Sequence, residues 1–127
     1  MHKVLIVDDD QESRNLLCEV LEANGYTVDA VADGSAAREA LTRDCDQRII
    51  IADLQMPNET GLDLLRNLRQ QHMKHDLILM SSFFSGRARE AAQELGAYAL
   101  LDKPFRLSEL LQAVAELAAK KPVEISS

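Results

Sequence analysis

Short apolar runs alternate five times with longer segments of helical period along this chain. The apolar runs are rich in Val, Ile and Leu and predict β-strands at residues 3–7, 26–32, 49–53, 76–81 and 97–102. The segments between and after them predict helices at residues 11–25, 34–44, 62–71, 86–96 and 107–120. Five strand–helix pairs in 127 residues predict an α/β fold, because consecutive parallel strands need crossover connections of this length. We expect a three-layer, doubly wound sandwich with a parallel five-stranded sheet between two helical layers.

Composition limits the partners that such a domain can have. The chain carries 21 acidic and 14 basic residues, so no basic face is expected to bind nucleic acid directly. No stretch has the length of a transmembrane helix, and the first ten residues turn acidic too early for a signal peptide, which predicts a cytoplasmic protein without a membrane partner. Cys18 and Cys45 lack the spacing of a zinc or redox pair and are expected to be reduced thiols.

Polar residues collect where the predicted strands end. The first strand leads into Asp8 and Asp9, the third ends in Asp53, the fourth ends in Ser81, and the fifth leads into Lys103. Because parallel strands place their carboxyl ends at one edge of a sheet, these side chains are expected to meet there. Two carboxylates about 4 Å apart repel by roughly 4 kcal/mol at an effective dielectric of about 20, so three of them need counter-charge. An all-oxygen set favours Mg²⁺, with Mn²⁺ as the alternative, and Lys103 supplies a further positive charge.

Four motifs, in order and with family-like spacing, resemble those of the receiver domains of two-component response regulators, the family that includes the chemotaxis regulators. The motifs are KVLIVDDD, IADLQMPNETGLDLL, LILMSS and LLDKPF. The resemblance implies a receiver domain at residues 1–120, with 121–127 as a tail or the start of a linker. It also implies a flavodoxin-like fold with strand order 2-1-3-4-5, and a signalling module that assists its own phosphorylation and dephosphorylation rather than an enzyme.

The resemblance assigns the acidic residues. Asp53 is implied to be the phosphoacceptor. Mg²⁺ is implied to be bound directly by Asp9, Asp53 and the main-chain carbonyl of Gln55, while Asp8 acts through a metal-bound water. This ligand set agrees with the preference of Mg²⁺ for oxygen ligands and retained waters.

The resemblance also assigns the residues that respond to the phosphoryl group. Lys103 is implied to contact the phosphoryl group, and the Lys103–Pro104 peptide bond is expected to be cis. Ser81 is implied to be the switch hydroxyl that moves toward it. The position three residues before the lysine commonly holds an aromatic side chain in the family, but Leu100 stands there in this chain. The usual coupling between a switch hydroxyl and an aromatic rotamer is therefore in question.

The implied partners are a sensor histidine kinase or phosphotransfer protein as the phosphoryl donor, and a downstream effector domain or protein. The family places contacts with effectors, or between the two copies of a homodimer, on the fourth helix, fifth strand and fifth helix, here residues 86–120. Phosphorylation is expected to control the effector through this face.

Two alternatives compete with this interpretation. A phosphatase of the haloacid dehalogenase type also places a nucleophilic Asp after a strand and uses Mg²⁺, but it requires a second Asp two residues later, where this chain has Gln55. A receiver that binds partners without being phosphorylated usually lacks one of the acidic or lysine positions, and none is missing here.

We predict that Phe83 slows loss of the phosphoryl group. Phe83 stands two residues after Ser81 and Gln55 two residues after Asp53, and in the resembling family these positions flank the path of the water that hydrolyses the acyl phosphate. Phe83→Glu should therefore shorten the lifetime of the phosphorylated protein, measured as the decay of phosphoprotein after the donor is removed. An unchanged half-life would contradict the prediction.

Overall fold

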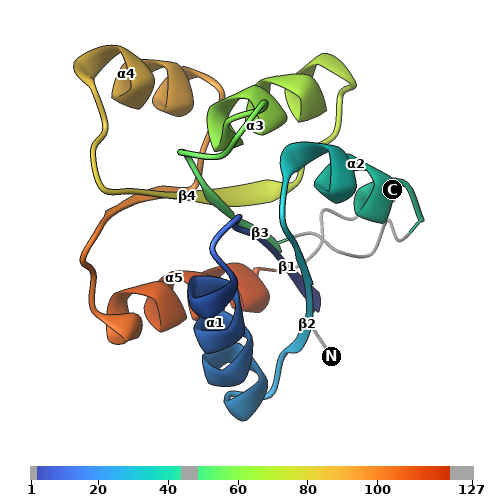
Figure 1. Cartoon of the computed structure of the whole chain (residues 1–127), viewed down its shortest axis with the longest axis vertical. Helices are drawn as coiled ribbons and strands as arrows, with labels where there is room; N and C mark the ends of the chain where they lie inside the picture. Colours follow the sequence, from blue (N-terminus) through green and yellow to red (C-terminus); the bar gives the residue numbers. More distant parts are fainter. Residues whose placement is uncertain (1–2, 44–48, 121–127) are drawn as a thin grey trace.

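The computed structural model describes residues 3–43 and 49–120, and its central element is one parallel sheet in the order β2-β1-β3-β4-β5 (Figure 1). The strands are β1 (Lys3–Val7), β2 (Thr27–Val31), β3 (Ile49–Asp53), β4 (Asp76–Ser81) and β5 (Ala99–Asp102). The chain first runs outward from β1 to β2 and then returns to the other side of β1, so the strand order reverses between β1 and β3. The predicted α/β class, parallel pairing and strand order are confirmed.

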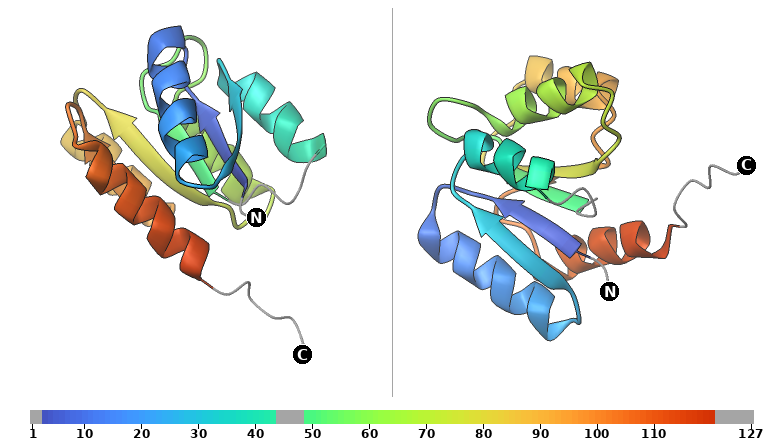
Figure 2. Two further views of the ribbon diagram at one scale, coloured as in Figure 1. Left: turned by 90° about the horizontal axis from the view of Figure 1, so that it is seen from below. Right: turned by 90° about the vertical axis from the view of Figure 1, so that its right-hand side faces the viewer.

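Five helices cover the two faces of this sheet (Figure 2). They are α1 (Gln11–Ala23), α2 (Gly34–Arg43), α3 (Gly61–Gln70), α4 (Gly86–Glu94) and α5 (Leu107–Ala119). One buried apolar cluster joins the sheet to α2, α3 and α4, and a second joins it to α1 and α5. The predicted three-layer sandwich is therefore present, with a core on each side of the sheet.

Strand β3 is buried along its whole length, and this burial explains its run of three isoleucines. Ile50 faces the α2–α3–α4 cluster, whereas Ile49 and Ile51 face the α1–α5 cluster. A central parallel strand is covered on both faces, so it favours a continuous apolar sequence over an alternating one. The strand therefore holds its last residue, Asp53, at a fixed place at the sheet edge.

Local capping signals determine where the helices begin. The Asp10 carboxylate accepts a hydrogen bond from the Ser13 backbone N–H at 3.3 Å, as its place before the helical pattern predicts. Thr60 and Asp63 form a reciprocal capping box at the start of α3. The Ser85 hydroxyl caps α4. Each of these caps lies at the end of a loop that leaves the carboxyl edge of the sheet.

The fifth strand is shorter than predicted, because Ala97 and Tyr98 lie outside it. Gly96 has a φ of 80°, and the Ala97 N–H still bonds to the Ala92 carbonyl at 2.9 Å, so Ala97 closes α4 instead. The Tyr98 N–H already donates to the Leu77 carbonyl on β4 at 2.8 Å, one residue before β5 begins. Tyr98 donates its hydroxyl proton to Glu116 on α5 at 2.6 Å. Helices α1, α3, α4 and α5 also end one or two residues earlier than predicted. The predicted end of the second helix at residue 44 and Cys45 lie outside the described residues.

The sequence predicts no transmembrane helix. None of the helices in the described part of the chain has both the length and the apolar character needed to cross a bilayer.

We predict that Gly61→Ala destabilises the protein. A Cβ atom at Gly61 would lie 2.7 Å from the Asp53 carbonyl oxygen and 2.7 Å from the side chain of Leu79, so backbone has to move. The expected loss is about 1–3 kcal/mol in the free energy of unfolding, measured by urea denaturation. Gly86→Ala is the matched control, because a Cβ atom there meets nothing within 4 Å. It should stabilise α4 by about 0.4–1 kcal/mol, and equal effects at both positions would contradict the steric argument.

Candidate functional site

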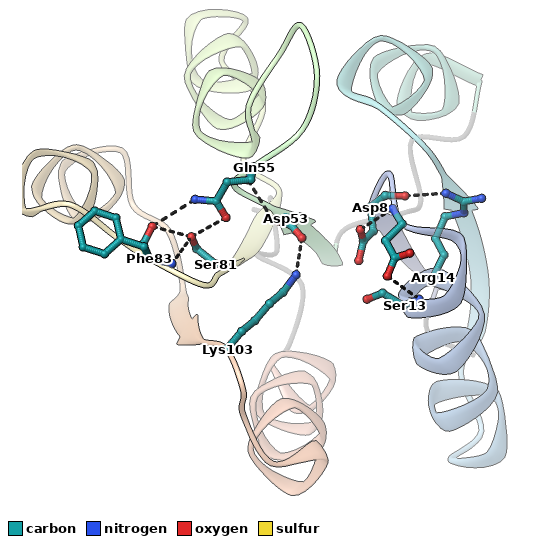
Figure 3. Close-up of polar contacts among 9 residues, drawn as sticks. Asp8, Ser13, Arg14, Asp53, Gln55, Ser81, Phe83 and Lys103 are labelled. Atoms are coloured by element: carbon teal, nitrogen blue, oxygen red, sulfur yellow. Dashed lines mark hydrogen bonds and ion pairs between the residues drawn. The ribbon is translucent and has the colours of Figure 1, made fainter.

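Asp53 lies at the end of β3 with only 5% of its surface exposed. Lys103, which follows β5, donates a charge-assisted hydrogen bond from Nζ to Asp53 Oδ2 (Figure 3). The backbone N–H of Gln55 donates to the other carboxylate oxygen, Oδ1, at 2.9 Å. The structure thus brings the predicted phosphoacceptor and the predicted phosphoryl-contacting lysine into direct contact.

Burial raises the pKa of Asp53 above its ordinary value. The hydrogen bond and positive charge of Lys103 oppose this increase, as does the hydrogen bond from the Gln55 backbone, while the nearby charge of Asp8 adds to it. The loss of solvent contact outweighs the lysine, so the pKa remains raised. One ammonium group does not fully compensate for placing this carboxylate at the buried end of β3.

Asp8 has a carboxylate oxygen that lacks a partner. Its side chain is fully buried. Oδ1 accepts a hydrogen bond from the Asp10 backbone N–H at 3.0 Å, but Oδ2 has no hydrogen-bond partner among the residues that the structure describes. A buried, unsatisfied carboxylate oxygen is costly, and a cation with its bound waters would satisfy it. The residues present therefore fit the predicted Mg²⁺.

Asp9 and Gln55 line one side of a groove of about 640 Å³ at the same edge of the sheet. Asp9 is exposed, unlike its neighbour Asp8. Within residues 3–43 and 49–120, no three His, Cys, Asp or Glu side chains form a complete metal-binding cluster. The predicted ligand set, in which two carboxylates bind directly and a main-chain carbonyl and waters complete the coordination, stays a prediction.

Arg14 is a residue of this site that the sequence motifs did not reveal. Its guanidinium donates from Nη1 to the main-chain carbonyl of Asp8 at 2.8 Å (Figure 3). Arg14 lies in the first turns of α1, so the bond ties the start of the helix to the end of β1. It helps to fix the backbone that carries Asp8 and Asp9. Basic residues early in a helix are common, and no pattern in the sequence marks this one.

Ser81 is fully buried at the end of β4, and its hydroxyl is not directed at Asp53. Its Oγ lies 2.8 Å from Gln55 Oε1 and 2.7 Å from the Phe83 carbonyl oxygen, and it accepts from the Phe83 N–H at 3.0 Å. The Phe83 ring is 69% exposed and points away from Asp53 (Figure 3). The side chain of Gln55 lies between Asp53 and Phe83 in this arrangement, so any shielding of Asp53 by the Phe83 ring requires the ring to move.

Leu100 and Tyr98 differ in their surroundings. Leu100 is half-buried and packs against the α2–α3–α4 cluster. The Tyr98 hydroxyl donates to Glu116 on α5, which raises the pKa of Tyr98. The Lys120 ammonium lies 5.9 Å from the centre of the Tyr98 ring. Tyr98 is therefore engaged at the end of β5 opposite to Lys103 and does not replace the missing aromatic.

The residues around Lys103 are held by backbone geometry. The Lys103–Pro104 peptide bond is cis, which confirms that expectation. The Lys103 N–H donates to the Ser81 carbonyl at 2.8 Å, which continues the pairing of β5 with β4. The lysine is thereby fixed beside the strand that carries Ser81.

This fold, with an acidic cluster and a lysine at the switch point of a parallel sheet, is that of a receiver domain of two-component signalling. The family model for the response regulator receiver domain matches residues 4–115. The chain belongs to this family of signalling domains.

Curated relatives and solved structures agree with this assignment. The chain is 38% identical over 114 residues to the transcriptional regulatory protein CpxR of Escherichia coli (strain K12), and the match covers 90% of this chain and 48% of the relative. It is 34% identical over 122 residues to the response regulator MprA of Mycobacterium ulcerans, covering 96% and 52%. The chain thus spans about half the length of these relatives.

Solved structures of receiver-type proteins from two different bacteria are also similar to this chain. The chemotaxis protein CheY4 of Vibrio cholerae superposes with a TM-score of 0.83 at 29% identity, covering 91% of this chain and 98% of that one. The response regulator TrrA of Thermotoga maritima, in complex with Mg²⁺ and BeF, superposes with a TM-score of 0.82 at 27% identity, covering 92% and 99%.

We predict that Asp53→Asn stabilises the Mg²⁺-free protein at neutral pH. Because the pKa of Asp53 is raised in the folded state, ionised Asp53 lowers the free energy of unfolding. This destabilisation disappears as the pH falls through the raised pKa toward the ordinary Asp range, where Asp53 is protonated in both states. The variant should show a higher urea midpoint than the wild type at pH 7 in chelator, and the difference should shrink on acidification. Asp102→Asn, which also removes one carboxylate charge but at an exposed position, is the control and should not raise the urea midpoint at pH 7. A difference that is constant with pH would contradict the prediction.

Proposed function

We propose that this chain accepts a phosphoryl group on Asp53 from the phosphohistidine of a sensor histidine kinase or phosphotransfer protein. The observation that carries the proposal is the buried Asp53 carboxylate, bound by the Lys103 ammonium and lying near Asp8, whose Oδ2 lacks a partner in the described part of the chain. A carboxylate that is fixed, desolvated and bound by a cationic group is suited to attack phosphorus.

The step is a displacement at phosphorus. A carboxylate oxygen of Asp53 forms the new O–P bond while the P–N bond of the phosphohistidine breaks, and the imidazole leaves with the electron pair and takes up a proton. Lys103 neutralises charge on the phosphoryl oxygens, and the Gln55 N–H helps to hold the carboxylate in place. The residues contribute position and charge, which is most of what phosphoryl transfer needs.

Mg²⁺ would be held by Asp9, Asp53 and the main-chain carbonyl of Gln55, with Asp8 acting through a bound water. Bound there, the ion supplies positive charge to phosphoryl oxygens. Mn²⁺ offers the same oxygen-based coordination and is the alternative.

The phosphorylated state would act through Ser81 and Lys103. The phosphoryl group brings about −1.5 to −2 charges, which attract the Ser81 hydroxyl and the lysine. The movement would pass to α4, β5 and α5, the face proposed to contact an effector domain, an effector protein or a second copy of the chain. The proposal places the receiver at residues 1–120 with 121–127 as a tail or linker, and places the protein in the cytoplasm.

A phosphatase of the haloacid dehalogenase type is less well supported. That chemistry needs an acid two residues after the nucleophile, and Gln55 carries an amide there. The Gln55 side chain is also engaged with Ser81 and Phe83 rather than directed at Asp53.

We predict that acetyl phosphate with Mg²⁺ places one covalent phosphoryl group on the wild-type chain. The adduct should be seen by intact mass spectrometry, should require the divalent ion, and should be absent in Asp53→Asn. Asp102→Asn, which changes an exposed carboxylate at the end of β5, is the matched control and should be phosphorylated like the wild type.

Other outcomes separate the alternatives. Release of inorganic phosphate over many turnovers, without a stable adduct, would favour the phosphatase. If the wild-type chain takes up no phosphoryl group from acetyl phosphate or from any phosphorylated kinase, the result would favour the other alternative, a receiver that binds partners without being phosphorylated.

A further inference from the structure

The side chain of Gln55 joins two loops at the candidate site. Its Nε2 donates to the Phe83 carbonyl at 3.2 Å, and its Oε1 lies 2.8 Å from the Ser81 hydroxyl oxygen (Figure 3). Gln55 belongs to the loop after β3, whereas Ser81 and Phe83 belong to the end of β4 and the loop that leads to α4. One carboxamide thus bonds to two residues of the neighbouring loop.

The Ser81 hydroxyl is held from several sides in this arrangement. It has one proton, which it can donate to either Gln55 Oε1 or the Phe83 carbonyl, and it accepts a hydrogen bond from the Phe83 N–H. The Ser81 side chain is fully buried, so no bulk water is at hand to replace a bond that is lost. Moving the hydroxyl toward Asp53 requires these bonds to break.

We propose that the Gln55 side chain is a clamp that holds Ser81 and the loop after β4 in the unphosphorylated arrangement, and so sets how readily the domain switches. This proposal rests on the function proposed above, because it concerns the hydroxyl that is proposed to respond to the phosphoryl group. Gln55 is here a positioning residue, since its side chain acts through Ser81 and does not contact Asp53.

The main-chain and side-chain roles of Gln55 are separable. The backbone N–H bonds to Asp53 Oδ1 and the backbone carbonyl is the proposed Mg²⁺ ligand, whereas the carboxamide bonds to Ser81 at the end of β4 and to Phe83 in the loop that follows. A substitution that keeps the backbone in place therefore tests the clamp without removing either main-chain group.

The clamped loop leads directly into α4. Ser85 caps the helix by accepting from the Ala88 N–H at 3.0 Å. Phe84, between the clamp and the cap, is buried, and the guanidinium of Arg89 lies 5.1 Å from the centre of its ring. Release of Phe83 by Gln55 would therefore free the segment that fixes the start of α4.

The test compares Gln55→Met with the wild type in the binding of beryllofluoride, a phosphoryl mimic, in the presence of Mg²⁺. Met has a similar length but makes neither hydrogen bond, so the unphosphorylated arrangement loses stability relative to the switched one. The apparent Kd for beryllofluoride should fall about five-fold, the worth of roughly one net hydrogen bond. Because the complex does not hydrolyse, an effect of Gln55 on dephosphorylation cannot produce this result.

Two further variants test the specificity of the effect. Gln93→Met makes the same chemical change at an exposed position on α4 and should leave the Kd unchanged. In a Ser81→Ala background, the change in log Kd for beryllofluoride caused by Gln55→Met should be less than half of the change in the wild-type background. The hydroxyl that the clamp holds is absent there. An unchanged Kd in Gln55→Met, or equal effects with and without the Ser81 hydroxyl, would overturn the proposal.

Hydrogen exchange distinguishes failure of the clamp from failure of the phosphoacceptor proposal. If the wild type binds no beryllofluoride, the phosphoacceptor proposal fails. The clamp is still measurable in the ligand-free protein, where the Phe83 amide, bonded to Ser81 Oγ, should exchange about five-fold faster in Gln55→Met and not in Gln93→Met. Equal Phe83 exchange in all three proteins would show that Gln55 does not hold the loop.

Discussion

The buried carboxylate of Asp53 is the constraint on which the site depends. Strand β3 is covered on both faces, so the residue at its end has little solvent with which to stabilise a charge. Counter-charge and hydrogen bonds must come from other parts of the chain. Lys103 supplies the ammonium from the end of β5, and the Gln55 N–H supplies a donor from the following loop. The raised pKa of Asp53 indicates that these groups compensate only in part, which is the physical reason to propose a divalent cation at this edge.

The sequence predicts those features that local patterns encode. The class, the strand order and both helical layers follow from five apolar runs, five helical segments and the receiver motifs, and the cap at Asp10 follows from its place before a helical pattern. The approach of Asp53 to Lys103 was also predictable, because both stand at carboxyl ends of parallel strands. Such predictions succeed because the direction of parallel strands alone determines which strand ends lie at the same edge of the sheet.

Other features depend on tertiary approach and leave no periodic signal. The prediction that the fifth strand begins at Ala97 was wrong, because the Ala97 N–H bonds to the Ala92 carbonyl and closes α4, so β5 begins only at Ala99. The pairing of Gln55 with Ser81, 26 residues away, depends on how two loops leave adjacent strands. The contact between Arg14 and the Asp8 carbonyl is of the same kind. These contacts could be recognised only once the loops were placed in space.

Because Leu100 stands where an aromatic is common, the proposed switch would depend more on the loop after β4. Leu100 has no polar group with which to follow a moving hydroxyl, and Tyr98 is held by Glu116 on the α5 side. The loop, in contrast, connects Ser81 to the start of α4 through Phe83 and Phe84, and Arg89 near the start of α4 bonds to Asp102 at the end of β5 at 3.1 Å. A change at Ser81 therefore has a continuous route to both α4 and β5 that requires no aromatic rotamer. Gln55 bonds to Ser81 and Phe83, the first two residues of that route, so its carboxamide is the contact best placed to set the proposed balance between the unphosphorylated and the switched arrangement.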